Sequence, residues 1–127
     1  MVGFHTNIEA DTLNNNNFRK VIHTGTHLQL VLMSLAPGEK IDMEVHPDND
    51  QFFRFESGVG EAELNGEVVS FKADDVLIVP AGTRHEIRNL SMTEALKLYT
   101  IYAPAHHPDG TIHATKADAV AAEMAEH

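Results

Sequence analysis

The 127 residues suffice for one domain with a modest core, and the content of 43% hydrophobic and 22% charged residues is typical of a globular protein. The formal net charge of −10 would repel phosphate groups, so we expect neither nucleic acid nor an anionic membrane surface as a partner. Cysteine is absent, which excludes disulfides and thiolate metal ligands, and no basic cluster followed by an apolar stretch opens the chain. These features predict a cytoplasmic location.

The first part of the chain is polar. Residues 1–17 end in four asparagines and have no periodic apolar face, so they are predicted to form a loop or a loosely attached arm. From residue 18 the pattern becomes that of strands. Residues 18–23 alternate weakly, residues 28–34 are apolar over most of their length, and residues 41–46 alternate with period two.

The strongest turn signal is Asn65-Gly66, because both residues tolerate the positive φ of a type I′ turn; it predicts a hairpin between residues 61–64 and 67–71. Further strands are predicted at residues 51–56, 76–79, 84–90 and 95–102.

A helix is predicted only near the C-terminus, where Thr115 and Asp118 resemble a capping box before an alanine-rich stretch. Many short strands joined by Gly, Pro and Asn turns indicate an all-β sandwich or barrel. We therefore expect an arm at 1–17, a barrel at 18–104, and a tail with a short helix at 105–127.

Four polar residues are candidates for a metal site. Glu44 and His46 are two apart on a predicted strand and should share one face. Gln51 opens the next strand, and His85 begins a strand much later in the chain. The alternative is that Glu44 and His46 form a solvated strand face and that His85 is a hydrogen-bonded core residue.

The chain resembles the cupin family at two gapped motifs. The first motif resembles Gly38-x5-Glu44-x-His46-x4-Gln51-x6-Gly58, and the second resembles Asp74-x5-Pro80-x-Gly82-x2-His85-x3-Asn89. The resemblance implies a double-stranded β-helix, or jelly roll, with a metal ion in one end of the barrel. It also implies a homodimer as the usual assembly.

Carried over by position, the family's metal ligands fall on Glu44, His46, Gln51 and His85. Glu44 replaces the family's usual first histidine, Gln51 replaces its glutamate, and Asp74 replaces a turn glycine. The formal charge of the ligand set is unchanged, because the carboxylate has moved from one position to another, and this favours a retained divalent metal ion. Two nitrogen and two oxygen ligands favour manganese, iron or nickel over zinc.

The candidate substrate pocket follows from strand alternation. Side chains that share a face with the ligands or lie on the inward face of the last strand are Phe53, Phe55, Ile87, Asn89 and Tyr102. Core filling is the alternative for the phenylalanines. Arg54 and Arg84 are predicted to point away, so no phosphate clamp is expected.

The tail at residues 105–113 contains His106, His107 and His113. A second metal site is conceivable there, but exposed loop histidines are favoured, since no carboxylate stands at a fixed strand spacing.

Three functions stay open. The first is a mononuclear-metal enzyme, of the oxygenase type or related, that acts on a small polar molecule. The second is a sugar isomerase of the phosphomannose-isomerase kind, and the third is a small-ligand-binding module without turnover. Fold alone does not separate them.

Overall fold

The computed structural model describes residues 2–125, and within them it contains ten strands and two helices. The helices are α1 (Ile8–Asn14) and α2 (Lys116–Ala125). The strands are β1 (Arg19–Thr24), β2 (Gln29–Leu35), β3 (Lys40–Glu44), β4 (Asp50–Ser57), β5 (Val59–Leu64), β6 (Glu67–Lys72), β7 (Val76–Val79), β8 (His85–Asn89), β9 (Leu96–Ala103) and β10 (Ile112–His113).

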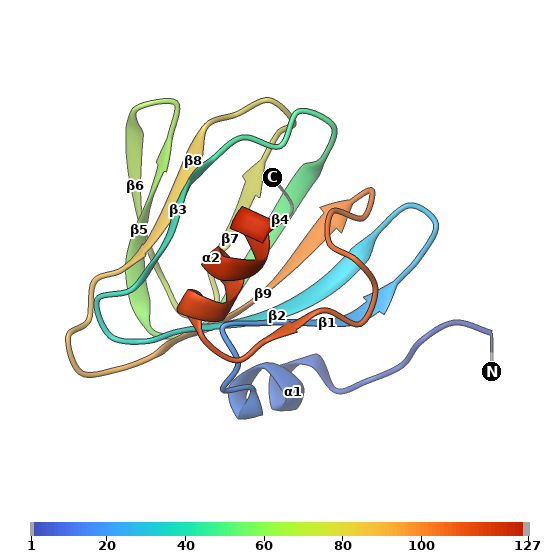
Figure 1. Ribbon diagram of the computed structural model, residues 1–127. Helices are drawn as coiled ribbons and strands as arrows, with labels where there is room; N and C mark the ends of the chain where they lie inside the picture. The colour runs from blue at the N-terminus through green and yellow to red at the C-terminus, as the bar shows by residue number, and fades with distance from the viewer. Residues whose placement is uncertain (1, 126–127) are drawn as a thin grey trace.

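The strands form two antiparallel sheets that enclose one core (Figure 1). The larger sheet has the order β10-β1-β2-β9-β4-β7, and the smaller has the order β3-β8-β5-β6. The core is apolar and aromatic, and its fully buried side chains include Val31, Phe53, Phe55, Ile87 and Leu98. The predicted all-β jelly roll with a short C-terminal helix is confirmed.

Two turns show how local sequence sets the strand pairing. Asn65 and Gly66 have φ values of 49° and 87°, as the type I′ turn of the β5–β6 hairpin requires. Asp74, which stands where the cupin motif usually has glycine, also adopts a positive φ of 75°. Its carboxylate forms an ion pair with Arg54 at 3.0 Å. Asparagine and aspartate tolerate this region better than other non-glycine residues, so the replacement keeps the turn.

The prediction of a loop at the N-terminus was wrong for residues 8–14, which form α1. The Asn7 side chain caps this helix by accepting a hydrogen bond from the Ala10 backbone N–H at 2.9 Å. α1 buries only Thr12, so it has no apolar stripe that a sequence pattern could reveal. Lys97 on β9 holds the end of the segment through the Asn15 carbonyl and, at 2.9 Å, through Asn16 Oδ1.

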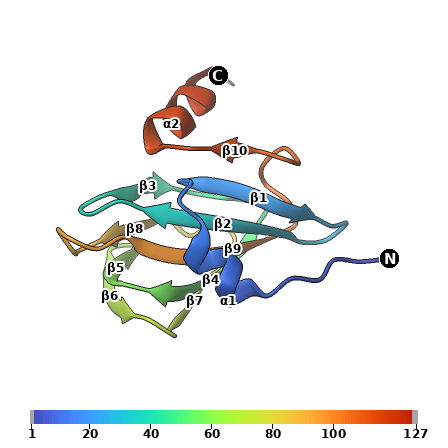
Figure 2. The same cartoon turned by 90° about the horizontal axis from the view of Figure 1, so that it is seen from below.

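The C-terminal helix lies outside the barrel, beyond β1 and β3 (Figure 2). The Asp118 backbone N–H donates to Thr115 Oγ1 at 3.1 Å, which confirms the predicted N-terminal cap. An ion pair of 3.0 Å joins Lys116, the first residue of α2, to Asp42 on β3. Between Val2 and Ala125, neither helix is long and apolar enough to span a membrane.

Gly60 allows β5 to pack closely between its neighbours. A Cβ atom at this position would overlap the Arg88 carbonyl oxygen and the Phe71 ring. Because the first of these is backbone, the strands would have to move apart. We expect Gly60→Ala to lower the free energy of unfolding by about 3 kcal/mol, measured by urea denaturation. Exposed Ser70→Ala on β6 is the control and should change it by less than about 0.5 kcal/mol; equal stability of both variants would contradict the packing argument.

Candidate metal centre

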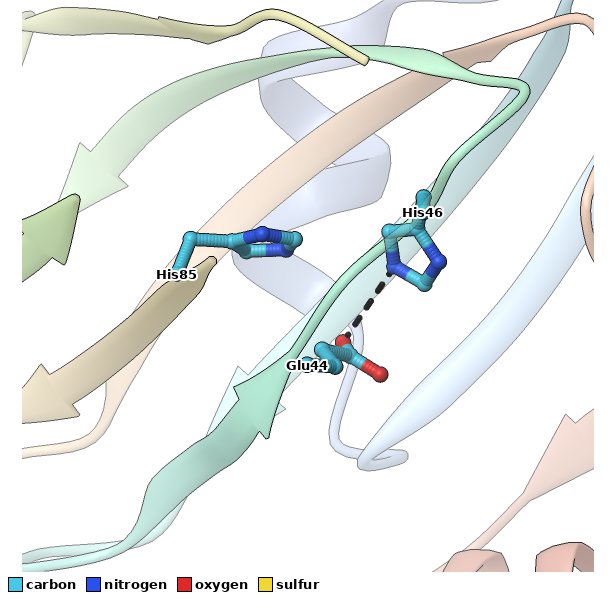
Figure 3. A group of neighbouring side chains, drawn as sticks. All are labelled: Glu44, His46 and His85. Carbon is cyan, nitrogen blue, oxygen red and sulfur yellow. Dashed lines mark ion pairs between the residues drawn. The ribbon is translucent and has the colours of Figure 1, made fainter. Parts of the chain in front are cut away.

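Three predicted ligands meet at one end of the barrel (Figure 3). Glu44 ends β3 and lies opposite His85, the first residue of β8, in the strand register. His46 follows two residues after β3 ends, and its carbonyl accepts a hydrogen bond from the Gly82 N–H at 3.0 Å. One potential ligand atom from each of the three residues lies within 4.8 Å of the others. This spacing is compatible with a single cation between them.

The two imidazoles have the correct nitrogens available. His46 and His85 are 5% and 1% exposed. His85 Nδ1 lies 3.0 Å from the Thr83 carbonyl oxygen, which can only accept, so Nδ1 carries the proton and Nε2 has the lone pair. The Nε2 atoms of both histidines are buried without a hydrogen-bond partner among residues 2–125. Buried polar atoms are normally satisfied, so these two atoms fit a metal ion.

The protonation states also suit metal binding. Burial lowers the pKa of His85, against the opposing effects of the Thr83 carbonyl and Glu44, so the imidazole is neutral at pH 7. Burial alone would raise the pKa of Glu44, but the close approach of His46, followed by attraction from His85 and Arg19, holds this pKa below its ordinary value. The Glu44 carboxylate, 3.5 Å from His46 Nε2, is therefore ionised.

Gln51, the fourth predicted ligand, is buried at the start of β4 and pairs with Tyr102 on β9. Its Nε2 donates to Thr100 Oγ1 at 3.0 Å, which orients the amide. Its Oε1 is buried and has no hydrogen-bond partner in the described part of the chain. The amide oxygen thus has a lone pair available to bind a metal ion, either directly or through water.

The five predicted pocket residues separate into different environments. Phe53, Phe55 and Ile87 are fully buried members of the core, and the Phe53 ring centroid lies 6.4 Å from that of His85. Tyr102 has its ring 5.6 Å from the His46 ring.

Asn89 lies at the opposite end of β8 from His85. Its amide nitrogen donates to the carbonyls of Leu35, Ala36 and Glu94, which gives it a structural role in a loop. Asn89 is therefore not brought to the metal centre.

Two tail histidines lie beside the site, which the sequence did not predict. The His106 ring centroid is 4.2 Å from that of His46, and His107 Nε2 lies 3.2 Å from the Tyr102 hydroxyl. The buried Gln29 side chain holds this segment. Its Oε1 accepts from the backbone N–H groups of His106 at 3.1 Å and His107 at 3.0 Å, and its Nε2 donates to the His107 carbonyl at 2.7 Å.

The expectation of exposed loop histidines was therefore only partly correct. His106 is exposed, but His107 and His113 are partly buried, and His113 belongs to β10.

A cavity of about 370 Å³ opens beside the triad. The side chains that line it come from the end of β3, the tail and α2: Glu44, Val45, His46, His106, His107, Pro108 and Glu123. The cavity is of the size of small-molecule sites, and its imidazoles and carboxylates are hydrogen-bonding groups.

A family model for the cupin domain matches residues 31–102, which include all four predicted ligands. This chain belongs to the cupin family. The cupin is 48% identical to the uncharacterized protein YrkC of Bacillus subtilis over 126 residues, which are 94% of this chain and 67% of YrkC. It is 44% identical to BH2720 of Bacillus halodurans, whose crystal structure matches with a TM-score of 0.91 over 93% of each chain.

A more distant relative is quercetin 2,3-dioxygenase of Bacillus subtilis. The cupin is 31% identical to it over 84 residues, which are 66% of this chain and 25% of that enzyme. The likeness therefore concerns about a quarter of a longer protein.

Burial lowers the pKa of His107 to about 2, helped by the charges of Arg19 and the neighbouring histidines. The unfolded chain, with an ordinary histidine pKa near ~6.5, binds a proton that the folded protein does not, so acid favours unfolding. We expect the metal-free protein to lose stability from pH 7.5 to 5.5, and His107→Gln to remove about 1 kcal/mol of that loss. Urea denaturation at both pH values measures this.

The exposed residue His27 provides the matched control for this pH series. His27→Gln should lose stability with acid as the wild-type protein does. If His107→Gln shows the full wild-type loss, the buried neutral state of His107 is wrong.

Proposed function

We propose that this cupin binds one divalent metal ion through Glu44, His46 and His85, with Gln51 Oε1 as a weaker fourth ligand. The observation that carries the proposal is the convergence of three potential ligand atoms within 4.8 Å, from Glu44 and from two buried histidines whose Nε2 atoms have no hydrogen-bond partner among residues 2–125. A core histidine that served only packing would have both ring nitrogens satisfied. A metal cation is a group that could bind all of these nitrogen and oxygen lone pairs at once.

Manganese, iron or nickel suits this ligand set better than zinc. The set has oxygen and nitrogen ligands and no sulfur, and two histidines with one carboxylate form the arrangement found in non-heme iron sites with open positions. Structural zinc favours a closed tetrahedral shell with stronger donors than an amide oxygen.

We infer further that the protein is a mononuclear-metal enzyme of the oxygenase type that acts on a small polar molecule. Support comes from the cavity of about 370 Å³ beside the triad and from the similarity to a protein named quercetin 2,3-dioxygenase. When bound, the metal ion would supply Lewis acidity or redox chemistry at open coordination positions. The chain itself contributes a buried, neutral His85 and a Tyr102–His107 contact at the cavity wall.

An oxygen-electrode screen of small polar compounds with the metal-loaded protein tests the reaction class. Oxygen uptake that depends on His85 supports an oxygenase. Turnover without oxygen uptake would instead support the isomerase alternative, and tight binding without turnover would support a binding module.

The metal site is tested by elemental analysis of protein purified without a polyhistidine tag. The wild-type protein should carry about one metal ion per chain. His85→Ala should lose the metal while remaining folded, because only Glu44, His46 and the weak amide ligand Gln51 are then left to bind it. His27→Ala removes an exposed histidine and should retain the metal.

Gln51→Ala should weaken the metal dissociation constant by roughly tenfold without abolishing binding. Wild-type metal content in His85→Ala would reject the triad. An unchanged dissociation constant in Gln51→Ala would remove Gln51 from the ligand set and leave the triad in place.

We also propose a homodimer located in the cytoplasm. Exposed apolar side chains on two edge strands support the assembly: Val76 and Ile78 on β7, and Val68 and Val69 on β6. Light scattering should give twice the chain mass of 14.0 kDa; a monomer mass at micromolar concentration would refute the dimer, and cell fractionation tests the location.

A further inference from the structure

Arg19 is a buried cation beside the candidate metal centre. Its side chain is 3% exposed and shares the inward face of β1 with Val21. It lines a second cavity, of about 170 Å³, together with Glu44 and Glu123. Glu44 and Glu123 also line the larger cavity beside the triad, so both spaces border the same two carboxylates.

The guanidinium of Arg19 is incompletely paired. Its Nη1 lies 3.3 Å from His113 Nδ1 and 3.5 Å from Glu123 Oε1, which are long distances for charge-assisted hydrogen bonds. Its Nε is buried and has no partner among residues 2–125. A buried arginine with a purely structural role would be expected to satisfy its donors, because an unpaired buried charge is costly. Arg19 therefore has hydrogen-bonding capacity left inside the cavity.

Its carboxylate partner can move away at little cost. Glu123 is 51% exposed, and ion pairs with an exposed member contribute little to stability. α2, which carries Glu123, buries only Ala119, and its second ion pair, Lys116 with Asp42, is at the far end of the helix. The last turns of α2 can thus leave the cavity without exposing any large apolar side chain that is now buried.

We propose that Arg19 binds a carboxylate group of the small molecule held at the metal centre, and that Glu123 occupies this position until the ligand's carboxylate replaces it. The proposal rests on the proposed metal site, which would hold the other end of the ligand. A guanidinium presents a planar fork of donors that matches the two oxygens of a carboxylate. The Glu123 carboxylate would then compete with the ligand's carboxylate for Arg19.

The charges around Arg19 favour a carboxylate over a phosphate. Glu44 and Asp42 line the same cavity, and a phosphate dianion would be repelled about twice as strongly as a carboxylate at the same distance. Lys116 and Asp42 offset each other, because they are paired at 3.0 Å, so the repulsion comes chiefly from Glu44. A space of about 170 Å³ also fits one small acid group rather than a bulky one.

The test uses two probes that differ by one charge, succinate and its monoamide succinamate, titrated calorimetrically into the full chain with and without Mn²⁺. The wild-type protein should bind succinate at least about tenfold more tightly than succinamate. Arg19→Gln should reduce this preference to about twofold or less while it retains wild-type Mn²⁺ stoichiometry. Inorganic phosphate should bind more weakly than succinate.

Glu123→Gln provides a test that does not disturb a buried group. Removal of the competing carboxylate should strengthen succinate binding by roughly fivefold. Glu67→Gln removes the same charge from the exposed start of β6 and should leave the affinity unchanged. If Arg19→Gln fails to fold, this pair decides the question alone.

Unchanged succinate affinity in both Arg19→Gln and Glu123→Gln would overturn the proposal, as would tighter binding of phosphate than of succinate. Failure of the wild-type protein to bind Mn²⁺ would refute the metal site instead. The metal-free titrations would then still show whether succinate binding depends on Arg19.

Discussion

The central constraint in this protein is the burial of unsatisfied polar atoms at one end of an apolar barrel. His46 Nε2, His85 Nε2 and Gln51 Oε1 are all buried and have no hydrogen-bond partner in the described chain. Each such atom costs about 1–3 kcal/mol when it is left unpaired. The fold buries these atoms, so a cation bound between them would recover stability as well as supply chemistry.

The fold keeps these groups in position through strand pairing and through hydrogen bonds from neighbouring residues. The pairing of β3 with β8 sets Glu44 opposite His85, and the Pro80–Gly82 turn binds the His46 carbonyl through Gly82. Thr83 and Thr100 then orient His85 and Gln51 by hydrogen bonds of 3.0 Å each. The arrangement of these side chains is therefore determined by the backbone and by neighbouring polar groups.

Much of the fold could be predicted because its signals are local. The Asn65-Gly66 turn, the period-two pattern around Glu44 and the Thr115 cap each depend on residues close in sequence. The candidate metal ligands could be predicted because they occupy matching positions in the two motifs. That Glu44, His46 and His85 lie close together could be seen only once the strand pairing was known.

The missed features depend on contacts between distant residues. α1 has a cap but no apolar stripe, so its helical state follows from docking against β9 rather than from a pattern. Arg19 meets Glu123 across 104 positions, and Gln29 meets His107 across 78. The residues of β1 alternate only weakly in polarity, so the sequence did not indicate that Arg19 points inward. The spacing of the tail histidines likewise did not indicate a contact with Gln29 on β2.

The three hydrogen bonds between Gln29 and the tail give the pocket two walls with separate origins. The barrel supplies Glu44 and His46, whereas the wall that carries His106 and His107 is a segment held by hydrogen bonds to the side chains of Gln29 and Asn49. Substitutions in that segment would therefore reshape this cavity during evolution while the strand pairing stays intact. Relatives with the same barrel but a different tail would then keep the arrangement of Glu44, His46 and His85 and differ in the shape of the cavity beside it.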